Sequence, residues 1–124
     1  MAGKASSSRR PEQVAESIRA TVAESLLRGD VRDPRVGLVT LSMVEVTRDL
    51  SHATIRVVPH GTMEEKEAAV EGLQSAAGFL RRKVAATLST RIVPELHFKL
   101  DLGFEYSQQI NKLLDEIKRE DEVP

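Results

Sequence analysis

The sequence predicts a small α+β domain with the element order α-β-β-α-β-α. Apolar residues recur with helical spacing in three stretches and alternate with polar residues in three others. About 30 residues separate the second and third alternating stretches, enough for a helical crossover between parallel strands. The 124 residues suggest one domain, a three-stranded sheet with helices on one face.

Composition narrows the class of protein. There is no cysteine, which excludes disulfide scaffolds, thiolate metal sites and cysteine nucleophiles. No apolar run approaches the roughly 18 residues of a membrane helix. The N-terminal residues lack the apolar core of a secretory signal, so we expect a cytoplasmic protein without a membrane partner.

The net charge of −1 is the sum over segments whose charges differ in sign. Residues 79–101 carry five cations and two anions, and residues 1–35 carry seven cations and five anions. An acidic C-terminal segment offsets this excess in the sum. Because local charge sets the affinity for phosphate, the near-neutral net charge does not exclude a nucleic-acid partner.

The first helix is predicted to begin at Pro11, a residue suited to a first helical turn. It ends near Gly29, which suits a left-handed position after a helix. Residues 1–8, small and polar, are predicted to be a disordered arm. The core-facing side chains of the helix recur every four residues: Val14, Ile18, Val22 and Leu26.

Residues 37–46 and 52–58 are predicted to form a β-hairpin with one buried face. The alternation changes phase within the first stretch, because Val39 and Leu41 would face one side and Val44 and Val46 the other. A β-bulge near Ser42 and Met43 would turn both pairs toward the core.

A long helical pattern follows from Met63 to about Ser89, opened by a capping box at residues 62–65. Gly78 interrupts it and predicts a kink, because an interior glycine weakens a helix by about 1 kcal/mol. Residues 96–100 alternate as the third strand. A last amphipathic helix is predicted from Ile110, Leu113, Leu114 and Ile117.

The segment from Ala76 to Lys83 is the strongest candidate for binding chemistry. A kink at Gly78 would free N–H groups at the start of the following helix, and such groups favour an anion. Arg81 and Arg82 would point away from the core, with Lys83 at the boundary. The alternative is a glycine needed for helix–sheet packing and an ordinary solvated basic face.

Two further basic elements have equally open interpretations. Arg9 and Arg10 could form an RNA-binding arm or a solubilising tail. Arg91 could extend the basic surface or cap the preceding helix.

The remaining polar residues give little sign of catalysis or of a cofactor. The three histidines, His52, His60 and His97, lack metal-binding spacing and lie apart in the sequence, so no metal site is expected. The glutamates of residues 64–71 suit a helix start electrostatically. Aromatic residues are too sparse for a base-stacking platform, so any RNA partner would be recognised through its backbone and shape.

Four segments, in order, resemble the bacterial ribosome-binding factor A family. Each motif is weak alone, but their order and spacing are fairly specific, and the similarity covers roughly residues 9–117. The segments are Arg9-x-x-Glu12-Gln13-Val14, Val44-Glu45-Val46-x-x-Asp49-Leu50-x-His52-Ala53, Ala76-x-Gly78-Phe79-Leu80-Arg81 and Arg91-x-x-Pro94-Glu95-Leu96-x-Phe98-x-x-Asp101.

The resemblance implies a type II KH-like domain over residues 9–118, with a flexible acidic tail at 119–124. It implies a binder of the immature 30S subunit that assists 16S rRNA maturation, including the 5′ end, and growth in the cold. It also implies a link to an assembly GTPase and no enzymatic activity. Ala76-Ala77-Gly78 would replace the GxxG loop of KH domains. Gly103 and Ser107 invert the family's usual serine–glycine order.

We therefore expect a monomeric ribosome assembly factor without a cofactor. The alternatives are a small nuclease acting on precursor rRNA, or a protein–protein adaptor that uses the last helix. The predicted RNA-binding residues are Arg9, Arg10, Ala76, Ala77, Gly78, Arg81, Arg82, Lys83 and Arg91.

Overall fold

The computed structural model describes residues 11–103 and 112–117. The predicted arm at 1–8, the tail at 119–124, and the predicted RNA contacts Arg9 and Arg10 lie outside the described residues. Within the described part, no helix has both the length and the apolar character to cross a membrane. The elements are α2 (Pro11–Arg28), β1 (Val39–Val46), β2 (His52–Pro59), α3 (Met63–Ser75), α4 (Ala77–Thr87) and β3 (Glu95–Leu100).

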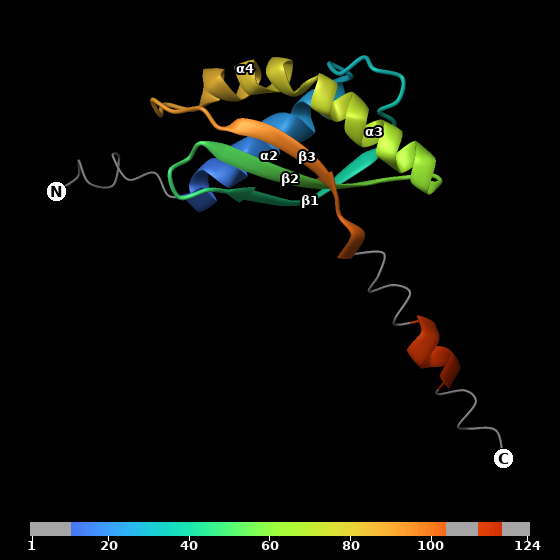
Figure 1. Cartoon of the computed structure of the whole chain (residues 1–124). Coiled ribbons are helices and arrows are strands. Elements are labelled where there is room, and N and C mark those ends of the chain that lie inside the picture. Colours follow the sequence, from blue (N-terminus) through green and yellow to red (C-terminus); the bar gives the residue numbers. More distant parts are fainter. Residues whose placement is uncertain (1–10, 104–111, 118–124) are drawn as a thin grey trace.

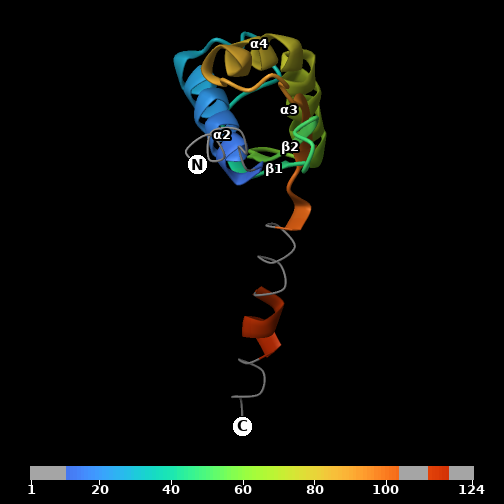
Figure 2. The ribbon, with the colours of Figure 1, turned by 90° about the vertical axis from the view of Figure 1, so that its left-hand side faces the viewer.

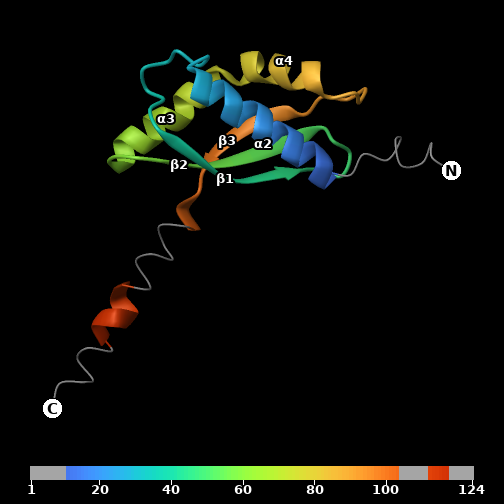
Figure 3. The same ribbon diagram turned by 180° about the vertical axis from the view of Figure 1, so that it is seen from behind.

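The elements form two layers, with α2, α3 and α4 together on one face of the sheet (Figures 1 and 2). The strand order is β1-β2-β3. The pair β1–β2 is antiparallel and the pair β2–β3 is parallel, as the crossover length predicts. Seen from behind, α2 runs across the sheet (Figure 3). Consequently the other face of the sheet is not covered by any described helix.

The predicted bulge in β1 is confirmed. The pairing register with β2 shifts between Leu41 and Met43. The guanidinium of Arg19 donates to the carbonyl oxygens of Leu41 at 3.1 Å and Ser42 at 3.4 Å, so α2 stabilises the irregular backbone. Residues on both sides of the shift pack against the core: Val39, Leu41, Val44 and Val46.

The core lies between the helices and the sheet. Burying one such aliphatic side chain contributes about 1.5–3 kcal/mol. Three of the four apolar residues predicted for the first helix are fully buried, and Leu26 is partly buried. Gly29 follows α2 with a φ of 74°, the left-handed conformation expected there. The side chains without solvent exposure are Val14, Ile18, Val22, Ala53, Ile55, Val57, Leu73, Leu80 and Val84.

The crossover begins at the predicted capping box. The Thr62 hydroxyl oxygen accepts from the Glu65 N–H at 3.2 Å, and the Glu65 carboxylate accepts from the Thr62 N–H at 2.8 Å. The second hydrogen bond stabilises the ionised carboxylate and lowers the pKa of Glu65. This reciprocal pair satisfies two N–H groups at the start of α3.

The predicted kink exists and lies within Ala76-Ala77-Gly78, as the family resemblance implied, but the break itself is at Ala76 and not at Gly78. The helix breaks at Ala76, which has φ −88° and ψ 0°. The Ala76 N–H donates to the carbonyl oxygens of Gly72 and Leu73, which closes α3. Gly78 lies two residues later, inside α4. The glycine therefore does not form the break. The break needs no glycine, because most residues can adopt the backbone conformation of Ala76.

The predicted last helix is confirmed over residues 112–117, whereas Ile110 lies outside the described residues. Its apolar side chains Leu113, Leu114 and Ile117 are between 53% and 56% exposed, so the domain core does not bury them. Of the pair that departs from the family pattern, Gly103 is helical and exposed, and Ser107 is not described.

Candidate nucleic-acid interface

The start of α4 has backbone N–H groups that lack an acceptor within the helix. The first intrahelical acceptor is the Ala76 carbonyl, which takes the Leu80 N–H at 2.9 Å. By helix geometry the N–H groups of Ala77, Gly78 and Phe79 have no intrahelical acceptor. No side chain caps this terminus. An uncapped helix start and the positive end of the helix dipole together favour an anion.

Gly78 stands at this terminus in open surroundings. A Cβ placed on it would meet only the Arg82 Nη1 atom, 4.0 Å away. Its φ is not in the positive range. Since neither backbone conformation nor packing demands a glycine, the alternative in which Gly78 serves helix–sheet packing is wrong. An exposed glycine does leave the α4 backbone accessible to a ligand.

Gly72, six residues earlier in α3, is the glycine that packing requires. It is buried, and a Cβ on it would lie 2.8 Å from Val36 Cγ2 and 3.2 Å from Asp33 Cγ. The loop after α2 therefore approaches the α3 backbone closely. Sequence reasoning missed this residue, because no local pattern shows which loop crosses the helix.

The arginines of α4 differ in their surroundings. Arg81 donates from Nε to the Pro94 carbonyl at 3.2 Å and from Nη2 to the Val93 carbonyl at 2.7 Å. These neutral acceptors hold the guanidinium between α4 and β3 without cancelling its charge. Arg82 is exposed and pairs with no acidic group among the described residues, and it points away from the core as predicted.

Arg91 is exposed in the loop between α4 and β3. No described acidic residue pairs with it. The helix α4 is closed instead by the Leu88 N–H, which donates to the Val84 carbonyl at 3.0 Å.

Lys83 has a partner that the sequence did not suggest. Its Nζ lies 3.1 Å from Asp30 Oδ2 and 5.5 Å from the centre of the Phe79 ring. The lysine is half-buried between α4 and the end of α2. Because Asp30 offsets its charge, Lys83 contributes less positive potential than Arg82 does.

A pocket of about 250 Å³ lies beside Gly78, between α4 and β3. Gln74 forms one wall: its Nε2 donates to the Leu96 carbonyl at 3.1 Å, and its Oε1 accepts the Phe98 N–H at 2.8 Å. The Gln74 amide thus forms hydrogen bonds with backbone groups on the edge of β3 that are not paired with another strand. The lining residues are Gln74, Ala77, Gly78, Arg81, Glu95, Leu96 and His97.

A second pocket, of about 270 Å³, lies on the other side of the break and includes Ala76, Phe79 and Arg32. Arg32 is exposed in the loop after α2 and was not among the predicted contacts. Its loop position gave no helical or strand pattern that would have placed it near Ala76.

The neighbouring loop is electrostatically neutralised. Asp33 accepts from Arg35 Nε at 3.0 Å and from Nη2 at 2.7 Å. This side-chain hydrogen bonding lowers the pKa of Asp33 to about 2. Arg35 also lies 3.5 Å from the Glu71 carboxylate, so its charge is already paired twice.

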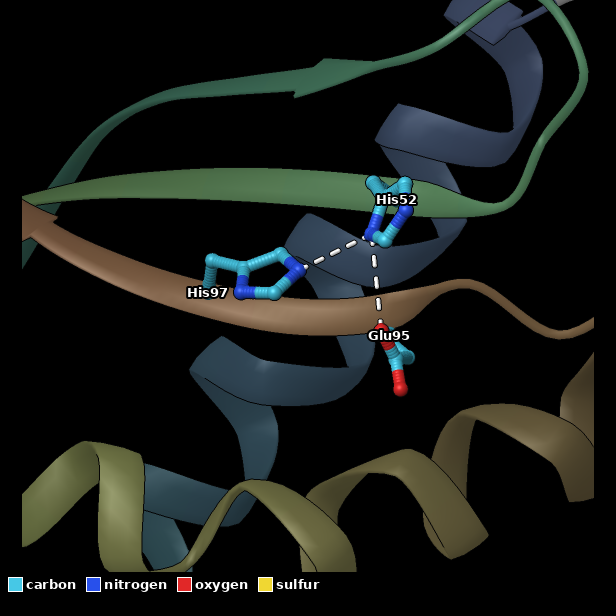
Figure 4. A group of neighbouring side chains, drawn as sticks. All are labelled: His52, Glu95 and His97. Carbon is cyan, nitrogen blue, oxygen red and sulfur yellow. Dashed lines mark hydrogen bonds and ion pairs between the residues drawn. The ribbon is translucent and has the colours of Figure 1, made fainter.

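Two histidines and a glutamate gather on the sheet face opposite the helices (Figure 4). His52 Nδ1 lies 3.0 Å from His97 Nε2 and 3.5 Å from Glu95 Oε2. The absence of a metal site was expected because the histidines lie apart in the sequence. That reason fails for His52 and His97, since β2 and β3 bring them together, and His60 remains outside the group.

Comparison with known proteins identifies the family. The family model described as ribosome-binding factor A matches residues 10–114. Ribosome-binding factor A of Thermomicrobium roseum is 46% identical over 111 residues, which cover 90% of this chain and 85% of that protein. The chain belongs to the ribosome-binding factor A family.

Solved structures agree with this assignment. One is the solution structure of a ribosome-binding factor A from Thermotoga maritima, whose sequence is 34% identical to this one. The match has a TM-score of 0.64 and covers 71% of this chain and 83% of that chain. A model of the Thermus thermophilus ribosome-binding factor A, fitted into a cryo-electron microscopy map of a 30S complex, is 24% identical. Its TM-score is 0.57, and the match covers 70% of this chain and 90% of that chain. The predicted family and the KH-like α+β fold are therefore confirmed.

Proposed function

We propose that this protein binds the 30S ribosomal subunit through the start of α4 and the basic residues around it. The family assignment supports a ribosomal partner, as does the 30S complex of the Thermus thermophilus member. The single observation that carries the choice of surface is Gly78. It is a glycine that neither backbone conformation nor packing requires, at an uncapped helix start.

The proposed contacts are with 16S rRNA phosphates. The N–H groups of residues 77–79 would receive one phosphate oxygen, and Arg82 and Arg91 would engage neighbouring phosphates. Arg81 would act partly as a positioning residue, because it is already held by Val93 and Pro94. Backbone contacts of this kind recognise RNA shape more than base identity.

The mechanism would be stoichiometric binding without chemistry of its own. A binder shifts an RNA conformational equilibrium only by its differential affinity for the two states. A protein that prefers a precursor form of the subunit would hold it until folding proceeds. Within this proposal the chain acts as a cytoplasmic monomer, assists 16S rRNA maturation and leaves with the help of an assembly GTPase.

The test is binding of purified protein to free 30S subunits over a salt series. Arg82→Ala and Arg91→Ala should each weaken binding and reduce the slope of log K against log salt by about 0.7–0.9, the value for one lost phosphate contact. Quantitative co-sedimentation gives both numbers.

The matched control is Arg48→Ala, which removes an exposed arginine from the turn between β1 and β2. It should leave both the affinity and the slope near wild type. An unchanged slope for Arg82→Ala together with Arg91→Ala would remove this surface from the proposal. A loss of the same size for Arg48→Ala would show that only overall charge matters.

A further inference from the structure

The group formed by His52, Glu95 and His97 results from the pairing of β2 with β3. His52 and Glu95 are register partners on these parallel strands. His97 lies two residues after Glu95, so its side chain points to the same face of the sheet. Figure 4 shows the three side chains turned toward one another. The sheet backbone therefore fixes their separation.

Two of the three separations between the ligand atoms lie near those of a small zinc coordination sphere. Zinc binds histidine nitrogen and carboxylate oxygen at about 2.0–2.2 Å, so tetrahedral ligand atoms lie roughly 3.3–3.5 Å apart. The His52–His97 and His52–Glu95 separations are 3.0 Å and 3.5 Å. All three ligand atoms lie within 4.8 Å of one another.

The group is accessible from solvent. The side chains of His52 and Glu95 are 51% and 58% exposed. No described helix covers this face of the sheet, so an ion could enter without any backbone movement.

We propose that His52, Glu95 and His97 form a three-ligand site for a zinc-class divalent cation. Two imidazoles select such an ion over Mg²⁺ or Ca²⁺, which prefer oxygen ligands. Three protein ligands leave a fourth position for water or for an oxygen of a bound partner. The inference goes beyond 30S binding and does not rest on it.

The site adjoins the proposed RNA surface. Glu95 and His97 also line the pocket beside Gly78 and Arg81. A bound dication would therefore add positive charge next to this pocket.

The experiment is a calorimetric titration of the full chain with Zn²⁺. Wild-type protein should bind one ion in this group, and Mg²⁺ should not displace it. His52→Ala and His97→Ala should each lower the affinity at least about tenfold, the size of effect seen for groups that support metal ligands. Glu95→Gln should lower it less.

The matched control is His60→Ala, which removes the third histidine of the chain, exposed just after β2. It should keep wild-type affinity. Imidazole ¹⁵N spectra give a local readout, in which Zn²⁺ should shift the nitrogens of His52 and His97 and leave those of His60 in place. Far-ultraviolet circular dichroism checks that each variant is folded.

Equal Zn²⁺ affinity in wild type, His52→Ala and His97→Ala would overturn the proposal. So would a loss in His60→Ala equal to the losses in those two variants. Displacement of Zn²⁺ by equimolar Mg²⁺ would also contradict it, because two imidazoles should favour zinc.

Discussion

The two glycines on either side of Ala76 have opposite surroundings. Gly72 in α3 is buried, and a side chain there would collide with Val36. Gly78 in α4 is exposed, and a methyl group there would meet no atom closer than 4.0 Å. The comparison shows that one residue type serves packing on one side of the break and leaves the backbone open on the other.

The same division holds for the charges near the break. On the α3 side, Arg35 is paired with Asp33 and Glu71. On the α4 side, Arg82 has no acidic partner among the described residues. The α3 end is thus a neutral packing surface, and the α4 start is where an unpaired arginine and an uncapped helix terminus coincide.

The largest expected effect is that of Gly72→Ala. The added Cβ would force Val36 or the helix to move, and overpacking of this kind typically costs about 1–3 kcal/mol, which the better helix propensity of alanine offsets by about 0.5–1 kcal/mol. Urea denaturation should show that loss in the free energy of unfolding. The control is Gly37→Ala in the neighbouring loop, where a Cβ would have no atom within 4 Å. Equal stabilities of the two variants would show that packing does not require a glycine at position 72.

Gly78→Ala should have a smaller and opposite effect on stability. Alanine is favoured over glycine in a helix, by about 0.5–1 kcal/mol in the interior and by less in the first turn, so the free energy of unfolding should rise slightly. Binding to 30S subunits should weaken several-fold, because the methyl group covers the backbone that we propose to receive a phosphate. Denaturation and co-sedimentation measure the two quantities on the same protein.

Ala85→Gly, at an exposed position of α4, is the matched control for this prediction. It should lower stability and leave subunit binding unchanged. If Gly78→Ala binds as wild type does, the exposed glycine has no part in binding, and its role in the comparison is lost.

The smallest expected effect is on the pH dependence of stability and comes from Asp33, which packs beside Gly72. Its pKa in the folded protein is about 2, against an ordinary value of 3.8. A lowered pKa means that the ionised group stabilises the fold above about pH 4, and that this contribution disappears as the pH falls toward 2. The stability difference between wild type and Asp33→Asn should therefore shrink across that interval. Denaturation curves at several pH values measure it.

Asp49 offers a matched carboxylate for the same experiment. Its pKa is also about 2, but the hydroxyl groups of Ser51 and Thr47 hold it, not a cation. High salt should reduce the contribution of Asp33 and leave that of Asp49 nearly unchanged, because salt screens ion pairs. A salt response of Asp49 equal to that of Asp33 would contradict this difference.

Much of the fold followed from local pattern. The spacing of Val14, Ile18 and Val22 is that of a buried helix face, and the phase change in β1 required a bulge if both apolar pairs were to reach the core. Periodicity succeeds here because burial selects one face of each element. The interior glycine alone placed the break two residues too late, at Gly78, whereas the kink that the family resemblance implied, Ala76-Ala77-Gly78, contains the observed break.

The candidate interface was only partly predictable. Arg82 was placed outward by helical spacing alone, which is a local property. Lys83 was predicted at the boundary of the core and among the RNA contacts, and its pairing with Asp30, 53 positions away in the sequence, was not foreseen. Gln74, Glu95 and His97 were missed because they reach the pocket through the docking of α3 and α4 against β3.

The sequence by itself determined the order of the elements, the bulge, the capping box and the family. These depend on the periodicity, cap chemistry and motifs that neighbouring residues carry. Only the tertiary structure decided which glycine is needed for packing, which cations stay unpaired, and that His52 and His97 meet. The physical reason is that these properties depend on atoms from segments distant in the chain, which come together only when the sheet and helices pack.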